Sequence, residues 1–241
     1  MLEKDRGVVL RSIKYGDNGL VVEVFSAHRG ALSFMVKCGR RGRGSNRSVL
    51  FRQLSMIAFD YDYKERASLQ RFSDVRLSSV YASIPYDMRK QSIALFLAEV
   101  LHGVLRHESQ NEPLYAYVCN SLLWLDAAAK DFANFHLVFM TRLARFLGFY
   151  PNVEEWHSGD WFDLRNACFV RGAPGHADCL KEEEAALLPL MLRMNYYNMG
   201  HFVMNRAQRW RFLEVLAQYY RLHVPEFPEL RSVAVLRDVF A

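Results

Sequence analysis

The sequence has few cysteines, and no two of them are closely paired. Cys38, Cys119, Cys168 and Cys179 lie far apart, and none belongs to a CxxC motif. Free buried thiols are therefore expected rather than a disulfide framework. The sequence also lacks the run of ~18 apolar residues that a membrane helix needs. The N-terminal residues do not combine basic residues, an apolar run and a small-residue cleavage site, so we expect a cytoplasmic protein.

Motifs of the common catalytic sites are missing as well. The chain has no GxxxxGK[ST] loop, and "GRRGRG" is not one, because the lysine and the following hydroxyl are absent. HExxH and GxSxG do not occur. Asp60 and Asp62 share one face of a predicted strand and are candidate Mg²⁺ ligands. No further acidic cluster surrounds them, so a solvated strand edge is favoured. We predict a protein that is not an enzyme and uses no cofactor.

The candidate zinc ligands are spaced too loosely to favour a metal site. They are His157, Cys168, His176 and Cys179. Only His176 and Cys179 form a close pair, whereas structural zinc sites usually contain two such pairs. Ordinary polar and core roles are the favoured interpretation, and no bound metal is predicted.

Composition indicates a folded chain with an uneven charge. The 241 residues are 51% hydrophobic and 14% aromatic. A chain of this size buries roughly 70% of the surface that it exposes when unfolded. Residues 1–80 carry 15 Lys and Arg against 8 Asp and Glu, whereas the remainder carries 16 against 18. This shift favours two domains, with the positive excess in the first.

The first 80 residues have the pattern of a small β-barrel. Five short segments rich in Val, Ile, Phe and Tyr are separated by turn residues, at 7–14, 19–26, 31–38, 53–63 and 67–76. Five strands are too few for a two-sheet sandwich, and we predict a five-stranded OB-type barrel as domain 1–80. Phe25, Phe34 and Phe59 are expected in its core. For Tyr15 and Tyr61, the sequence does not decide between a position in the core and stacking on bases.

Residues 81–241 are predicted to form a mainly α-helical domain, because apolar residues recur there at helical spacing. Helices are expected over 87–108, 112–129, 133–149, 182–195, 206–223 and 228–240, and the first three are expected to pack together. Residues 151–181 lose this periodicity, so an irregular insertion or a small hairpin is expected there. The fold class is therefore α+β with two domains.

The segment "KCGRRGRGSNRS", residues 37–48, carries five cations, three glycines and no acidic residue. Glycine lets the backbone approach a phosphate chain, Ser and Asn donate hydrogen bonds, and guanidinium groups bind phosphate oxygens in pairs. On an OB barrel, nucleic acid usually crosses the face of the second and third strands. We name residues 37–48 the basic loop and predict that it contacts phosphates; a solvated loop without a ligand is the alternative.

The N-terminal sequence from Gly7 to Tyr61 resembles the N-terminal domain of the RecO family of bacterial recombination mediators. The matching elements are Tyr15–Leu20, His28–Gly30, Lys37–Arg41 with Arg47–Ser48, and Phe51–Ser55. "LFLAEVLHGVLRHESQNEPLYAYVCNSLLWLD" resembles the family's helix pair, and "RLARFLGFYP" resembles its "L-x-x-L-G-Y/F-x-P" helix end. The resemblance covers most of the chain and depends on the order of several weak motifs.

This resemblance implies an OB barrel followed by a helical domain, and a function in DNA repair. Members of the family bind single- and double-stranded DNA, anneal complementary strands and bind the C-terminal tail of single-stranded DNA-binding protein. With RecR they help to load RecA. Many relatives carry a four-cysteine zinc site where this chain has only Cys168 and Cys179. Apolar packing of Trp156, Trp161, Phe162 and Phe169 is the expected replacement.

Family positions give two sets of candidate site residues. Lys37, Arg40, Arg41 and Arg47 match the family's basic loop and are predicted to contact phosphates. Arg11, Lys14 and Arg43 are added because they lie nearby in the sequence. The acidic, Phe-ended partner tail needs a cation beside an apolar pocket. Arg142 and Arg145, one helical turn apart, are the predicted tail site; surface solubility or a local ion pair is the alternative.

Two further functions stay open at this point. An RNA-binding barrel with a helical docking domain would use the same basic loop and would prefer strands that carry a 2′-OH. An interaction scaffold without nucleic acid would tolerate reversal of the charges of Arg40, Arg41 and Arg47. The family resemblance favours DNA over RNA, and the lack of a counter-charge near the loop in the sequence favours nucleic-acid binding over the scaffold.

Overall fold

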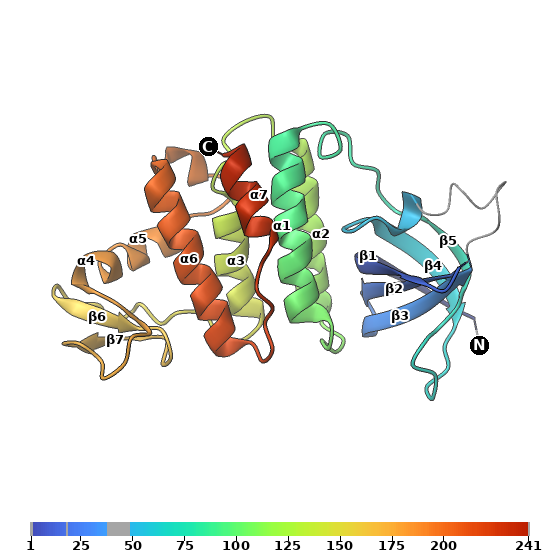
Figure 1. Ribbon diagram of the computed structural model, residues 1–241, viewed down its shortest axis with the longest axis horizontal. Helices are drawn as coiled ribbons and strands as arrows, with labels where there is room; N and C mark the ends of the chain where they lie inside the picture. Colours follow the sequence, from blue (N-terminus) through green and yellow to red (C-terminus); the bar gives the residue numbers. More distant parts are fainter. Residues whose placement is uncertain (1, 18, 38–48, 241) are drawn as a thin grey trace. The chain divides into compact units, whose positions relative to one another are not determined.

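A computed structural model describes residues 2–17, 19–37 and 49–240 (Figure 1). The chain divides into two compact units. The N-terminal unit contains Met1–Ala127 and Leu230–Val239, and the second unit contains Ala128–Glu229 and Phe240–Ala241. The predicted domain boundary after residue 80 stays a prediction. Among the described helices, none has the length and apolar character of a membrane-spanning segment.

The N-terminal unit begins with the predicted five-stranded antiparallel sheet. Its strands are β1 (Leu2–Tyr15), β2 (Gly19–Ser26), β3 (Gly30–Lys37), β4 (Met56–Asp62) and β5 (Phe72–Leu77), in the order β3-β2-β1-β4-β5. β1 pairs with β4 along its first half and with β2 along its second half, and its register shifts between Val9 and Arg11. Such a shift bends a strand, which lets one strand serve both halves of a curved sheet.

The sheet curves but does not close into a continuous barrel. The gap lies between β3 and β5, and we call it the seam. Among the described residues, one bridge crosses it, in which the Met35 amide donates to the Gln70 carbonyl (2.9 Å) and the Gln70 amide donates to the Ser33 carbonyl (2.8 Å). The prediction of an OB-type sheet is confirmed, with an open seam between the first and last strands of the order.

Aromatic rings fill the inside of the sheet. Phe34 is fully buried and stacks on Phe72, with ring centroids 3.9 Å apart. Phe59 and Tyr61 pack edge-on against Phe34 at 5.2 and 5.6 Å. The predicted burial of Phe25, Phe34 and Phe59 is confirmed. Tyr61, for which the sequence did not decide between the core and base stacking, is a core residue. Burial raises the pKa of its hydroxyl well above the usual value.

Three helices complete the N-terminal unit: α1 (Met88–Leu105), α2 (Glu112–Ala127) and α7 (Ser232–Val239). The Asp126 carboxylate accepts hydrogen bonds from the backbone amides of Ala82, Ser83 and Ile84. Burial disfavours its ionised form, but these three donors outweigh burial and hold the pKa of Asp126 below its usual value. The segment between β5 and α1 is thereby fixed to the end of α2.

The last helix of the chain returns to the N-terminal unit. The Glu99 carboxylate on α1 accepts hydrogen bonds from the amides of Arg231 (3.0 Å) and Ser232 (2.8 Å), where α7 begins. These are unpaired donors of a helix N-terminus, and a carboxylate is their preferred partner. The contact joins residues more than 130 positions apart in the sequence.

The second unit contains α3 (Phe135–Phe146), α6 (Arg206–His223) and the short helices α4 (Glu182–Ala185) and α5 (Leu188–Leu192). The single helix predicted over 182–195 is therefore wrong, since two short helices occupy it. Leu213, Leu216, Ala217 and Tyr220 form a buried apolar stripe on α6, whereas Trp210 is half-buried. The Tyr220 hydroxyl donates to the Met140 carbonyl of α3 at 2.7 Å.

A small sheet lies within residues 151–181, where an irregular insertion or a small hairpin was expected, and its antiparallel pair β6 and β7 matches the hairpin. It contains β6 (Asp160–Asp163), β7 (Cys168–Arg171) and β8 (Cys179–Leu180), in the order β7-β6-β8. Phe162 is buried and packs edge-on against Phe169, with centroids 5.1 Å apart. Trp161 donates to Glu182 at 3.3 Å, whereas Trp156 is 39% exposed and lies outside this small core. Only part of the predicted aromatic packing is therefore present.

Candidate nucleic-acid interface

Lys37, where the basic loop begins, and Phe51, three residues after its end, both border the seam, whereas residues 38–48 lie outside the described residues. Arg40, Arg41, Arg43 and Arg47 belong to that part. β3 ends at the exposed Lys37, where the loop begins. On the far side of the loop, Phe51 is only 3% exposed, and its carbonyl accepts a hydrogen bond from Ser12 on β1 (2.6 Å).

The register of the strands brings several predicted site residues onto one face. Residues that pair directly across neighbouring strands project to the same side of a sheet. The paired rows are Arg11–Glu23–Ser33, Ile13–Val21–Met35 and Tyr15–Gly19–Lys37. We call the surface formed by these nine residues the outer face. It presents Arg11 and Lys37 as cations and Tyr15, 63% exposed, as an accessible ring.

The outer face contains one carboxylate, and a histidine of α1 binds it. Glu23 lies beside Arg11 in the sheet, and its Oε2 is 2.8 Å from Nε2 of His102. Neither Arg11 nor Lys37 forms an ion pair with any residue that the structure describes. Gly19, which has no side chain, pairs with both Tyr15 and Lys37 in this row.

Lys14 does not belong to this surface. It pairs with Leu20, which pairs with Val36, and this row projects to the opposite side of the sheet from Arg11 and Tyr15. The sequence grouped Lys14 with Arg11 because they are neighbours along the chain. A strand separates residues three positions apart onto opposite faces, so nearness in sequence was a poor guide here.

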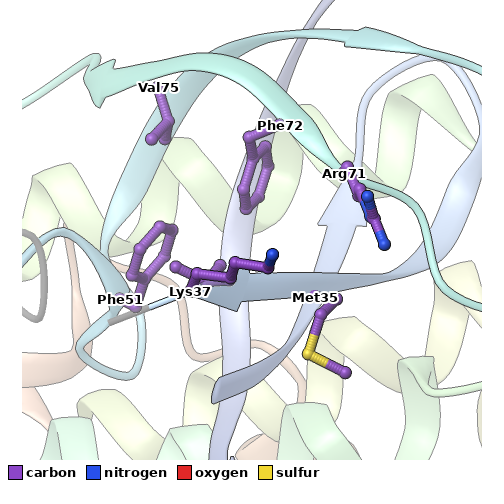
Figure 2. Close-up of a pocket in the computed structure, with 7 residues that line it drawn as sticks. Met35, Lys37, Phe51, Arg71, Phe72 and Val75 are labelled. Carbon is purple, nitrogen blue, oxygen red and sulfur yellow. The ribbon is translucent and has the colours of Figure 1, made fainter. Parts of the chain in front are cut away.

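A pocket of about 280 Å³ opens at the seam, next to the outer face (Figure 2). Its walls come from the end of β3, the start of β5 and the residue where the basic loop returns: Met35, Val36, Lys37, Phe51, Arg71, Phe72 and Val75. Arg71 was not singled out from the sequence. It follows Gln70, the residue that bridges to β3, so the bridge places Arg71 on the same pocket as Lys37.

The two arginines of the predicted tail site are both exposed on α3. The guanidinium carbon of Arg145 lies 5.9 Å from the centroid of the Tyr150 ring. Phe146 and Tyr150 are each 37% exposed, so apolar surface adjoins the cations. Neither Arg142 nor Arg145 forms an ion pair with another described residue.

A separate apolar groove of about 820 Å³ lies in the same unit. Leu187, Leu190 and Val203 line it, whereas Arg142 and Arg145 do not. Arg211, a cation at this groove, is already paired with both carboxylate oxygens of Glu184, at 2.5 and 2.9 Å. The groove therefore offers apolar surface with its nearest guanidinium neutralised.

The candidate metal ligands have ordinary structural partners. His157 Nδ1 and His176 Nε2 each lie 3.4 Å from a carboxylate, of Asp160 and Asp163 respectively. Across residues 2–17, 19–37 and 49–240, no three His, Cys, Asp or Glu side chains are grouped as a metal site would require. The three described cysteines are free, as predicted, but they are half-buried rather than buried.

Comparison with known proteins gives matches along the whole chain. The family models described as Recombination protein O N terminal and Recombination protein O C terminal match residues 1–81 and 85–232. Proteins named DNA repair protein RecO from Bacteroides fragilis and Phocaeicola vulgatus are 46% and 44% identical to it over 241 residues, covering 100% of both chains. The same-named protein of Porphyromonas gingivalis is 32% identical over 244 residues, again covering 100% of both. With both halves matched and relatives aligned from end to end, the chain belongs to the RecO family of recombination and DNA repair proteins.

Proposed function

We propose that this chain is a non-catalytic mediator of recombinational repair that binds single- and double-stranded DNA through its N-terminal unit. Phosphates would contact Lys37, Arg11 and the loop residues Arg40, Arg41, Arg43 and Arg47. The observation that carries the proposal is the outer face, where two cations without described ion pairs flank the exposed Tyr15. Lys14, predicted with this group, projects to the opposite side and would contribute to affinity only through its charge.

Neutralisation of phosphates explains how such a surface would promote annealing. Two complementary strands repel each other through their phosphates, and cations placed along one strand reduce that repulsion. Phosphate contacts are indifferent to sequence, which suits a protein that must anneal any pair of complementary strands. An exposed tyrosine adds stacking that is equally tolerant of sequence.

Membership of the RecO family supports the remaining partners of this proposal. We infer that the chain acts with RecR to load RecA on DNA coated by single-stranded DNA-binding protein, and that the second unit binds that protein's tail. Arg142 and Arg145 lie beside the exposed Phe146 and Tyr150. A tail that ends in acidic residues and a phenylalanine matches this combination of cations and apolar surface.

The nucleic-acid part of the proposal predicts that DNA competes at least as well as RNA. A labelled single-stranded DNA bound to the full chain is displaced with unlabelled DNA or RNA of identical sequence. The described cations recognise phosphate rather than the 2′-OH, so the two competitors should act within a few-fold of each other, with no advantage for RNA. Displacement by RNA at a tenth of the DNA concentration would instead support the RNA-binding module.

The tail site is tested with a labelled peptide that has acidic residues and a C-terminal phenylalanine. Arg142→Glu with Arg145→Glu is expected to weaken peptide binding by roughly 20-fold or more, because each lost charge-assisted contact contributes about 1–3 kcal/mol. Arg171→Glu with Arg221→Glu is the matched control, since both residues are exposed in the same unit. Equal weakening by the two double variants would mean that only net charge matters, and a Val203→Glu change that alone abolishes binding would move the site to the groove.

A further inference from the structure

We propose that the pocket at the seam holds one unstacked base of a single DNA strand, whose flanking phosphates bind Lys37 and Arg71. This inference rests on the proposed DNA binding and adds a specific subsite to it. Lys37 and Arg71 border the pocket together with Phe51 and Phe72 (Figure 2). A base inserted here would turn away from the outer face, together with its flanking phosphates. It would enter the gap between β3 and β5.

The walls of the pocket provide a rigid aromatic surface. Phe72 is stacked on Phe34 at 3.9 Å with their planes 7° apart. Phe51 lies nearly parallel to Phe72, at 16°, with centroids 5.6 Å apart. These rings are held by the core, so they lose little side-chain freedom when a base contacts them. Stacking on an aromatic surface accepts any base, because every base has a π face.

The cations at the pocket have no competing carboxylate among the described residues. Lys37 and Arg71 are both exposed, and neither has an ion pair in the part of the chain that the structure describes. They reach the pocket from opposite sides of the seam, at the end of β3 and just before β5. A base between them would therefore have a cation available for the phosphate on each side of its sugar.

The size of the pocket restricts what it can take. Its volume of about 280 Å³ lies just below the roughly 300–1,000 Å³ of typical small-molecule sites, which suits a single flat group. A base pair is too large for it, and a stacked base within a duplex cannot present its face. The pocket would therefore bind single strands and leave duplex binding to the outer face and the basic loop.

Oligonucleotides with and without bases distinguish binding of a base at this subsite from binding of phosphates alone. A thymine oligonucleotide and an abasic oligonucleotide of equal length carry the same phosphates. Wild-type protein should bind the thymine strand roughly 5- to 140-fold more tightly, which corresponds to about 1–3 kcal/mol for one stacked base. Val75→Trp places a large side chain in the pocket and should remove this advantage while affinity for the abasic strand stays unchanged.

Val80→Trp is the matched control, because Val80 is 77% exposed and does not line the pocket. Arg71→Ala should weaken binding of both strands, whereas Arg66→Ala, at another exposed arginine of the unit, should change neither. Amide hydrogen exchange of the β-strands β1 to β5 verifies that each variant is folded. A thymine advantage that persists in Val75→Trp and disappears in Tyr15→Ala would overturn the pocket and assign the stacking to the outer face.

A measurement on the unaltered protein gives an independent result. Irradiation of a bound strand that contains 5-iodouracil should cross-link a base to Met35, Phe51 or Phe72, as located by mass spectrometry of the peptides. Cross-links confined to Tyr15 would contradict the proposal. Failure of both strands to bind at low salt would refute DNA binding itself, whereas equal binding of both strands would refute only the pocket.

Discussion

Replacement of Arg40, Arg41 and Arg47 by glutamate together is expected to weaken binding of single-stranded DNA by roughly a hundredfold or more at 0.1 M salt. Each single-strand phosphate contact adds about −0.7 to the slope of log affinity against log salt. Three lost contacts reduce the magnitude of this slope by about 2.1. Over the tenfold change from 1 M to 0.1 M salt, this corresponds to a loss of about two decades of affinity. Repulsion between the new carboxylates and the phosphates adds to this loss. Fluorescence anisotropy of a labelled oligonucleotide measures it.

A second triple variant distinguishes the effect of charge in the basic loop from the effect of the net charge of the chain. Arg171, Arg193 and Arg221 are exposed residues of the second unit, and their replacement by glutamate changes the net charge equally. This control should retain affinity within a few-fold. A loss as large as that of the loop variant would show that total charge, rather than the basic loop, determines binding. Full retention of affinity and function by the loop variant would favour the scaffold without nucleic acid.

Phe34→Ala is expected to destabilise the N-terminal unit by about 3–5 kcal/mol, because it removes a large buried ring and leaves a cavity. Phe34 contacts Phe59, Tyr61 and Phe72, and no part of its surface is exposed. The rest of the ring cluster cannot fill the space without leaving its own packed positions. Amide hydrogen exchange of β1 to β5 should accelerate roughly 140- to 4,000-fold, which is the same free energy expressed as an opening equilibrium.

Two internal comparisons make this result specific. Tyr15→Ala removes a ring from the same sheet, but Tyr15 is 63% exposed, so exchange should change by less than threefold. Exchange of α6 should be unaffected by Phe34→Ala, because α6 belongs to the second unit. Unchanged exchange of the strands in Phe34→Ala would contradict the placement of this ring at the centre of the sheet.

The secondary structure was largely predictable because its determinants are local. Alternation of apolar and polar residues fixed the five strands, and apolar residues at helical spacing fixed α1, α2, α3 and α6. The interval 182–195 has a helical pattern throughout, yet the structure divides it into α4 and α5. Pro189 lies near the start of α5, a position that proline favours, and this residue was the available signal for a new helix start.

Long-range contacts were not predictable from pattern. Nothing local indicates that Glu99 caps α7 or that the sheet stays open between β3 and β5. Tyr15 and Tyr61 both lie in predicted strand regions, and only the folded structure shows that one is exposed and the other is buried.

The candidate site stays a prediction, which was drawn from charge and to which the structure adds the position of the described residues. Uncompensated cations in the sequence defined the basic loop, and the structure places Lys37, where the loop begins, and Phe51, three residues after it, at the seam. The sequence grouped Lys14 with Arg11, from which the register separates it, and did not single out Arg71, because the positions of both residues depend on which strands pair. Arg71 lies within the predicted segment 67–76, directly before Phe72, and a cation next to an aromatic residue was the available signal for it.

The central claim is that phosphates, rather than the protein's own carboxylates, neutralise the cations around the outer face and the basic loop. The salt dependence of single-strand binding by the unaltered chain tests it most directly. If five cations contact phosphates, the slope of log affinity against log salt is about −3.5, so affinity falls roughly a hundredfold between 50 and 200 mM salt. A slope near zero over that range would contradict the claim, because contacts to a strand that release no counterions cannot be contacts of cations with its phosphates.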